Sequence, residues 1–151
     1  MNDREITQAL AQSGIEVLET MFFVDAVPAD EPPAEAFSVE ITFDGDPPGH
    51  FLLHIAAPAA ASIAANFLGE DPRTLTPPQV ADVSCELANM ICGAALSRLE
   101  RAATFRLGPP HCGASLPACP VAVSLATPDG VLSLHLQLES PVCPSPAKSA
   151  F

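Results

Sequence analysis

Proline spacing is the feature that most limits how this chain can fold. The 151 residues include 17 prolines, but none lies within residues 1–27 or 79–108. A proline inside a helix costs about 3 kcal/mol, so these two long proline-free windows are where long helices are expected. The prolines between the windows gather in short clusters, which are typical of loops and strand ends.

The first window predicts a helix over residues 3–20. Asn2 and Glu5 have the spacing of a capping box, and apolar residues follow at helical intervals. Turn residues and alternating apolar residues predict the other elements of the first half. These are a strand at 21–28, a hairpin with strands at 37–43 and 50–56, and an alanine-rich helix at 58–68.

The second window predicts the longest helix, from Pro77 to about Arg101. Thr76 is placed to be its N-cap, and Gln79 completes a second capping box. Three strands are expected after this helix, with a proline-rich loop between the first two. These strands are predicted at 103–107, 121–126 and 131–139.

The order of these elements indicates a duplication. A helix followed by three strands occurs twice, with one extra helix between the two units. Residues 14–21 and 84–91 align in residue type at a separation of 70 residues. This predicts an α+β fold in which two long helices pack on an antiparallel six-stranded sheet. We expect a single domain over residues 1–140 and a flexible C-terminal tail over residues 141–151.

Composition excludes several classes of partner. Six Lys and Arg residues against 18 Asp and Glu residues give a net charge of −12, too few cations for a nucleic-acid surface. The N-terminus has no basic segment followed by an apolar run, and Pro, Gly or charged residues interrupt the apolar stretches, so no membrane span is expected. Five cysteines without a signal peptide predict reduced thiols and a cytoplasmic location.

The helix in the second window is apolar around most of its circumference and carries one narrow polar stripe. Its members are Asp82, Glu86, Asn89, Gly93, Ser97 and Glu100. Glu86 and Asn89 are three residues apart, so their side chains are neighbours. A glycine inside a helix costs about 1 kcal/mol, so Gly93 suggests open space beside Asn89 or the close approach of another backbone. The spacing alone also fits a solvated face without a function.

The run Asp82-x-x-x-Glu86-x-x-Asn89-x-x-x-Gly93 resembles the signature of the CheC/CheX/FliY group of chemotaxis phosphatases. The duplicated helix-and-three-strand pattern over about residues 3–139 is similar to that family as well. The resemblance implies a phosphatase that hydrolyses the aspartyl phosphate of a CheY-like response regulator. It also implies that Glu86 pairs with the regulator's active-site lysine and that Asn89 orients the attacking water. Asp82 and Gly93 match supporting positions.

The residue types suit this chemistry. Phosphoryl transfer has a loose transition state, so a catalyst acts mainly by positioning and by charge compensation. The amide of Asn89 is able to accept a hydrogen bond from water and donate one to a phosphoryl oxygen without adding charge. A carboxylate at that position would repel the phosphoryl group. We expect no cofactor in this chain, because the resemblance places Mg²⁺ in the partner receiver domain.

The first helix has glutamate where the motif needs asparagine, since its matching residues are Glu16 and Glu19. We therefore expect the first half to be non-catalytic. This single motif is more similar to CheX than to CheC, which implies a homodimer. A non-catalytic adaptor of the same fold, binding a receiver or a flagellar-switch protein, is the alternative. A thiol or metal role for Cys112 and Cys119 is the weakest hypothesis, because two thiols are too few metal ligands.

Overall fold

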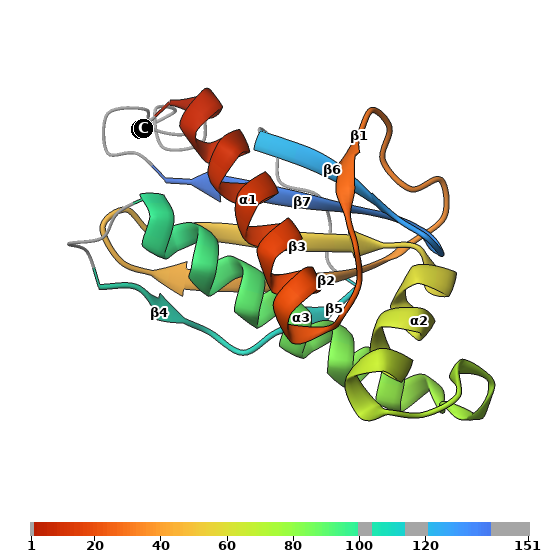
Figure 1. The fold of residues 1–151 in the computed structure, drawn as a ribbon. Coiled ribbons are helices and arrows are strands. Elements are labelled where there is room, and N and C mark those ends of the chain that lie inside the picture. The colour runs from red at the N-terminus through yellow and green to blue at the C-terminus, as the bar shows by residue number, and fades with distance from the viewer. Residues whose placement is uncertain (1, 100–103, 114–120, 140–151) are drawn as a thin grey trace.

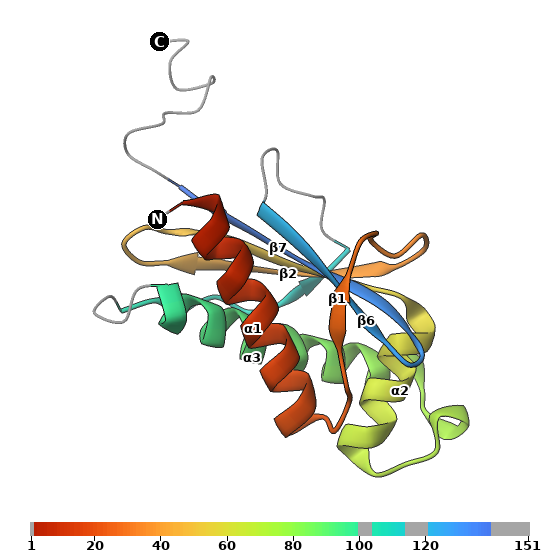
Figure 2. The ribbon, with the colours of Figure 1, turned by 45° about the horizontal axis from the view of Figure 1, so that its top comes forward.

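A computed structural model describes residues 2–99, 104–113 and 121–139. In this part of the chain, helices lie on one face of an antiparallel sheet, and the two long ones run side by side (Figures 1 and 2). The elements in order are α1 (Asp3–Met21), β1 (Val27–Ala29), β2 (Phe37–Asp44), β3 (Gly49–Ile55), α2 (Ala57–Leu68), the 3₁₀ turn η1 (Pro72–Thr74), α3 (Pro77–Leu99), β4 (Arg106–Leu107), β5 (His111–Cys112), β6 (Val121–Thr127) and β7 (Gly130–Leu138).

The order of the strands shows the duplication. The sheet runs β1-β6-β7-β3-β2-β4, with β5 also paired to β2. Strands β1, β2 and β3 of the first half correspond to β4, β6 and β7 of the second half. When each strand is replaced by its counterpart, the strand order reads the same from the opposite edge of the sheet. The long helices follow the same rule, because α1 packs on β6 and β7 whereas α3 packs on β2 and β3. The predicted α+β fold is confirmed, with β5 as a strand beyond the expected six.

Helix α1 begins as the sequence predicts and approaches the sheet closely at one glycine. The Asn2 side chain accepts a hydrogen bond from the Glu5 backbone N–H at 2.9 Å. A Cβ atom added to Gly14 would lie 2.7 Å from Leu125 Cδ1 and 2.8 Å from Leu134 Cδ1. Only a residue without a side chain allows the helix to lie this close to β6 and β7.

The strand predicted at 21–28 is wrong. Helix α1 continues to Met21, and strand structure begins only at Val27. The backbone N–H groups of Phe22 and Val24 both donate to the Leu18 carbonyl, which closes the end of the helix. Phe23 has a φ of 58°, a conformation outside the extended region. The apolar run therefore forms a helix end and a turn rather than a strand.

Helices α2 and α3 match their predictions closely. Helix α2 ends at Gly69, whose φ of 67° is left-handed. At the start of α3, the Thr76 backbone N–H donates to Gln79 Oε1 at 2.8 Å, and the Gln79 N–H donates to Thr76 Oγ1 at 3.3 Å. This reciprocal pair is the predicted capping box.

The remaining predictions for the second half differ in outcome. The strand expected at 103–107 is paired only at Arg106–Leu107, and the proline-rich segment after it contains β5. The expected end of α3 near Arg101 and the tail at 141–151 lie outside the described residues. The last hairpin is present as β6 and β7, close to its predicted bounds.

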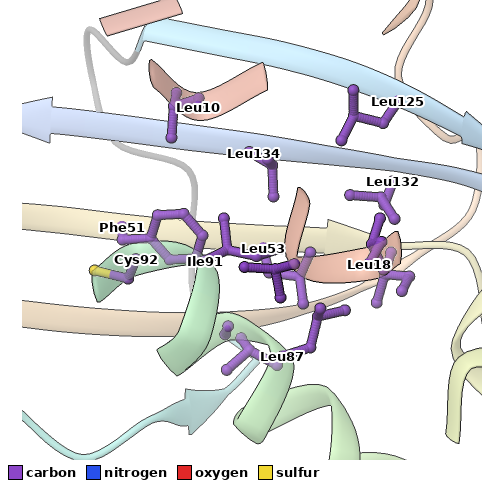
Figure 3. Packing of buried hydrophobic residues seen from close by; sticks show 14 of the residues in the cluster. Leu10, Leu18, Phe51, Leu53, Leu87, Ile91, Cys92, Leu125, Leu132 and Leu134 are labelled. Atoms are coloured by element: carbon purple, nitrogen blue, oxygen red, sulfur yellow. The ribbon is translucent and has the colours of Figure 1, made fainter. Parts of the chain in front are cut away.

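The core lies between the long helices and the sheet (Figure 3). Leu10 and Leu18 of α1, Leu125 and Leu134 of the sheet, and Leu87 and Ile91 of α3 belong to one buried cluster. By length and composition alone, α3 is long and apolar enough to cross a membrane. The sequence alone predicts no segment of this kind, because Pro, Gly or charged residues interrupt the apolar stretches. The apolar side of α3 is buried against the sheet and the other helices, as in the core helix of a globular domain.

Candidate functional site

Packing orients α3 so that its polar stripe faces outward. Leu87, Ile91 and Cys92 are fully buried in the core (Figure 3). On the opposite side, the predicted stripe residues reach the surface to different extents. Asp82, Glu86 and Ser97 are exposed, Asn89 and Gly93 are half-buried, and Glu100 lies outside the described residues.

Glu86 and Asn89 lie one helical turn apart on this surface. Among the described residues, neither side chain makes a hydrogen bond or ion pair with another group of the protein. Asn89 is half-buried, whereas Glu86 is exposed. Both groups are therefore available to an external partner.

Gly93 provides space next to this pair. A Cβ atom added to Gly93 would have no neighbour within 4 Å. Of the two possibilities raised by the sequence, open space and close approach of another backbone, the described part of the chain shows open space. A glycine that costs helix stability without serving internal packing is consistent with the approach of another molecule.

The pair lies on the outward-facing side of α3. A shallow groove exists farther along, between the N-terminal half of α1 and the end of α3, but neither Glu86 nor Asn89 lines it. The nearest groove residue on α3 is Arg98, nine residues from Asn89 and about 14 Å along the helix axis. In the described ranges, no three His, Cys, Asp or Glu residues are placed to hold a metal ion.

The matching surface of α1 has the same burial pattern. Residues 11–18 and 81–88 show an identical order of buried, half-buried and exposed positions, as the predicted separation of 70 residues requires. In this alignment, Glu16 corresponds to Glu86 and Glu19 corresponds to Asn89. The Glu16 carboxylate already accepts a hydrogen bond from Arg98 of α3, with 2.7 Å between the charged groups.

The α1 surface also ends sooner. Helix α1 stops at Met21, two residues after Glu19, whereas α3 continues for ten residues after Asn89. The residue that corresponds to Gly93 is Phe23, which is 74% exposed. Phe23 lies beyond the end of α1, so the first half has no helical surface at the position that Gly93 occupies in α3.

The cysteines differ in their surroundings. Cys92 is buried in the core, and burial raises the pKa of its thiol to about 12. Cys85 is half-buried, and burial, together with the nearby Cys112 of β5, raises the pKa of its thiol to about 11. Cys119, which the sequence grouped with Cys112, lies outside the described residues.

Comparison with known proteins places these features in a family. The family described as Chemotaxis phosphatase CheX matches residues 37–115. No curated protein sequence matches the chain. The crystal structure of chemotaxis protein CheX from Vibrio vulnificus is 20% identical with a TM-score of 0.72, covering 92% of this chain and 99% of that one.

Two more solved structures share the fold. The structure of a CheX–CheY–BeF₃–Mg²⁺ complex from Borrelia burgdorferi matches with a TM-score of 0.71 and 19% identity, covering 88% of this chain and 97% of that one. FliY from Thermotoga maritima matches with a TM-score of 0.59 and 15% identity, covering 89% and 90%. The family match spans more than half of the sequence and includes all of α3. This chain therefore belongs to the CheX family of chemotaxis phosphatases.

Proposed function

We propose that this protein accelerates hydrolysis of the aspartyl phosphate of a CheY-like receiver domain. The observation that carries the proposal is the pair Glu86 and Asn89, which lies on the exposed stripe of an otherwise buried helix. The family supports this activity, and the CheX–CheY complex from Borrelia burgdorferi supports a CheY-like partner. We also expect a homodimer, as the resemblance implies, and a cytoplasmic location, as the cysteine content predicts.

Glu86 is proposed to align the two proteins. Its exposed carboxylate has no partner among the described residues, so it is free to form an ion pair with the receiver's active-site lysine. An ion pair that loses water at a protein interface becomes stronger than the same pair in solvent. The role of Glu86 is thus to fix the position of α3 relative to the phosphoryl group.

Asn89 is proposed to position the attacking water. Its carbonyl oxygen accepts a hydrogen bond from that water, while its N–H₂ group donates to a phosphoryl oxygen. Because Asn89 is half-buried, its side chain has fewer accessible rotamers than a fully exposed amide, so less entropy is lost when the water is bound. Orientation of this kind contributes to catalysis without any covalent step on this chain.

Asp82 and Gly93 are proposed to support the pair. Asp82 lies one turn before Glu86 on the exposed stripe, at the edge of the expected contact. Gly93 leaves open space next to Asn89, which allows the receiver's backbone to approach. Mg²⁺ belongs to the receiver in this scheme, so we expect this chain to need no cofactor.

The direct test is dephosphorylation of a phosphorylated CheY-like receiver in the presence of Mg²⁺. We expect Asn89→Ala to reduce the acceleration by about 100-fold while the chain still binds the receiver. Glu86→Gln should weaken binding more than it lowers the maximal rate. Ser97→Ala is the matched control, because Ser97 is exposed on the same stripe but two turns beyond Asn89.

The outcomes separate the proposal from its alternative. Full activity in Asn89→Ala would exclude the water-positioning role. Receiver binding by the wild-type chain without any acceleration would instead support the non-catalytic adaptor. Equal losses in Ser97→Ala and Asn89→Ala would show that the stripe acts only as a binding surface.

A further inference from the structure

The four histidines of the chain share the outer face of the sheet, which is the face turned away from the helices. Val39 and Ile41 of β2 belong to the core, so the residues that alternate with them along the strand point to the outer face. Residues that lie opposite each other on paired strands point to the same face. The pairs that place the histidines are Ser38 with His54, Thr42 with His50, Glu40 with His111 and Leu52, and Leu52 with His135.

His54 and His135 form a pair at the joint between the two halves of the chain. His54 lies on β3 of the first half and His135 on β7 of the second half, and these strands are neighbours at the centre of the sheet. The two imidazole rings meet edge to face, with ring centroids 6.4 Å apart. Ser38 Oγ lies 2.7 Å from His54 Nδ1, within hydrogen-bond distance. Ser133 Oγ lies 2.9 Å from His135 Nε2, so both rings are held in place.

The surroundings of His135 favour its neutral form. The residue is only 7% exposed, and its Nδ1 atom is buried without a hydrogen-bond partner in the described part of the chain. When Nε2 donates to Ser133 Oγ, Nδ1 is the unprotonated acceptor of a neutral ring. A second proton on Nδ1 would create a buried, charged N–H group without an acceptor, which is costly. Burial and the nearby His54 accordingly lower the pKa of His135.

The carboxylates of the outer face lie beside a different histidine. Glu40 Oε2 and Glu139 Oε1 are 3.8 and 3.7 Å from ring nitrogens of His50. The other charged or titratable groups that the strands place on this face are Asp44 of β2, Arg106 of β4 and His111 of β5. Strands β6 and β7 contain no Asp, Glu, Lys or Arg. Within the described ranges, no ion pair involves His54 or His135, so a proton on this pair has no carboxylate to compensate its charge.

We propose that the His54–His135 pair makes the joint between the two halves of the sheet sensitive to acid. In the unfolded chain, His135 takes up a proton near pH 6.5. In the folded chain it does so only at lower pH, because the ring is buried and a charge on His54 repels a second charge. The stability contributed by the neutral ring is therefore complete above about pH 6.5 and is lost as the pH falls through the folded pKa. The proposal does not depend on the phosphatase activity.

NMR spectroscopy of the full chain tests the protonation of the pair directly. The imidazole Cε1–H resonances are followed from about pH 8 to about pH 5 and are assigned with single His→Gln variants. We expect the His135 resonance to titrate with a midpoint below about pH 6.5. In His54→Gln, this midpoint should move to higher pH, because the repulsion between the two rings is removed. A midpoint at or above about pH 6.5, or one that His54→Gln leaves unchanged, would overturn the proposal.

Urea unfolding across the same pH range tests the effect on the fold. As the pH falls below about 6.5, the folding equilibrium constant of the wild-type chain should decrease more than that of His135→Gln, by up to about tenfold for each pH unit. His50→Gln is the matched control, because His50 lies on the same face beside two carboxylates, and it should retain the loss. Equal pH dependence in the wild type and His135→Gln would overturn the proposal. If His135→Gln does not fold, the NMR titrations of the wild type and His54→Gln decide the question.

Discussion

The two long helices of this protein are alike in burial and unlike in surface chemistry. Both α1 and α3 place an apolar side on the sheet, and residues 11–18 and 81–88 have the same order of buried and exposed positions. They differ at the outward-facing pair, which is Glu16 and Glu19 on α1 but Glu86 and the half-buried Asn89 on α3. The fold thus constrains the buried side of each helix and leaves the outer side free to diverge.

The largest expected effect comes from giving α3 the surface residues of α1. Asn89→Glu places a second carboxylate next to the phosphoryl group, so we expect a loss of about 100-fold or more in receiver dephosphorylation. The reciprocal Glu19→Asn should leave the rate within about twofold of wild type. Two features explain this asymmetry, because Arg98 holds Glu16 and α1 ends at Met21. Recovery of activity when Glu19→Asn is added to Asn89→Glu would show that α1 is a competent second site.

The next effect concerns how closely each helix approaches the sheet. Gly14→Val would place its Cβ atom against the δ-methyl groups of Leu125 and Leu134, so we expect a loss of about 1–3 kcal/mol in the free energy of unfolding. The corresponding residue of α3 is Ser84, whose hydroxyl donates to the Val80 carbonyl at 2.8 Å. Ser84→Ala is the matched control, and urea unfolding measures both variants. Equal stability of Gly14→Val and wild type would contradict the tight packing of α1.

A smaller change in the free energy of unfolding, of opposite sign, is expected for a glycine substitution on α3. Gly93→Ala meets no neighbour within 4 Å, and alanine favours the helix, so the free energy of unfolding should rise by about 0.5–1 kcal/mol. Receiver dephosphorylation should fall at the same time, because the methyl group occupies the space proposed for the receiver's backbone. Unfolding experiments and the phosphatase assay together check this opposition. Higher stability with full activity would remove Gly93 from the proposed contact.

The smallest effect is expected for the ion pair between the helices. Glu16 and Arg98 are partly exposed, so a double-mutant cycle with Glu16→Gln and Arg98→Ala should give a coupling of about 0.2–1 kcal/mol that weakens in salt. Phosphatase activity should not change in Glu16→Gln. A change in activity, with stability unaltered, would assign a function to the first helix that its sequence does not suggest.

Much of the fold could be predicted from local patterns. Proline-free windows and capping residues such as Asn2 and Thr76 locate α1 and α3 closely, because both signals act over a few residues. The same periodicity placed Glu86 and Asn89 on one polar stripe, and both reach the surface as that pattern requires. Their catalytic roles remain predictions.

The failures of prediction have long-range causes. The apolar run after Met21 suggested a strand, yet Phe22 is buried and stacks on Phe67 of α2 with ring centroids 4.9 Å apart. Strand β5 exists because its two residues pair with β2, and no alternation over two residues would reveal it. Each of these features depends on segments that are distant in the sequence.

The crossed packing of the helices has a consequence for how the chain reaches its native state. Helix α3 lies on β2 and β3 of the first half, and the centre of the sheet joins Leu52 to His135. Such distant pairings require large loops to close early, which slows folding and makes it cooperative. Neither half is expected to form a stable core when expressed alone. The first half, which we expect to be non-catalytic, therefore supplies the strands on which the helix with Glu86 and Asn89 packs.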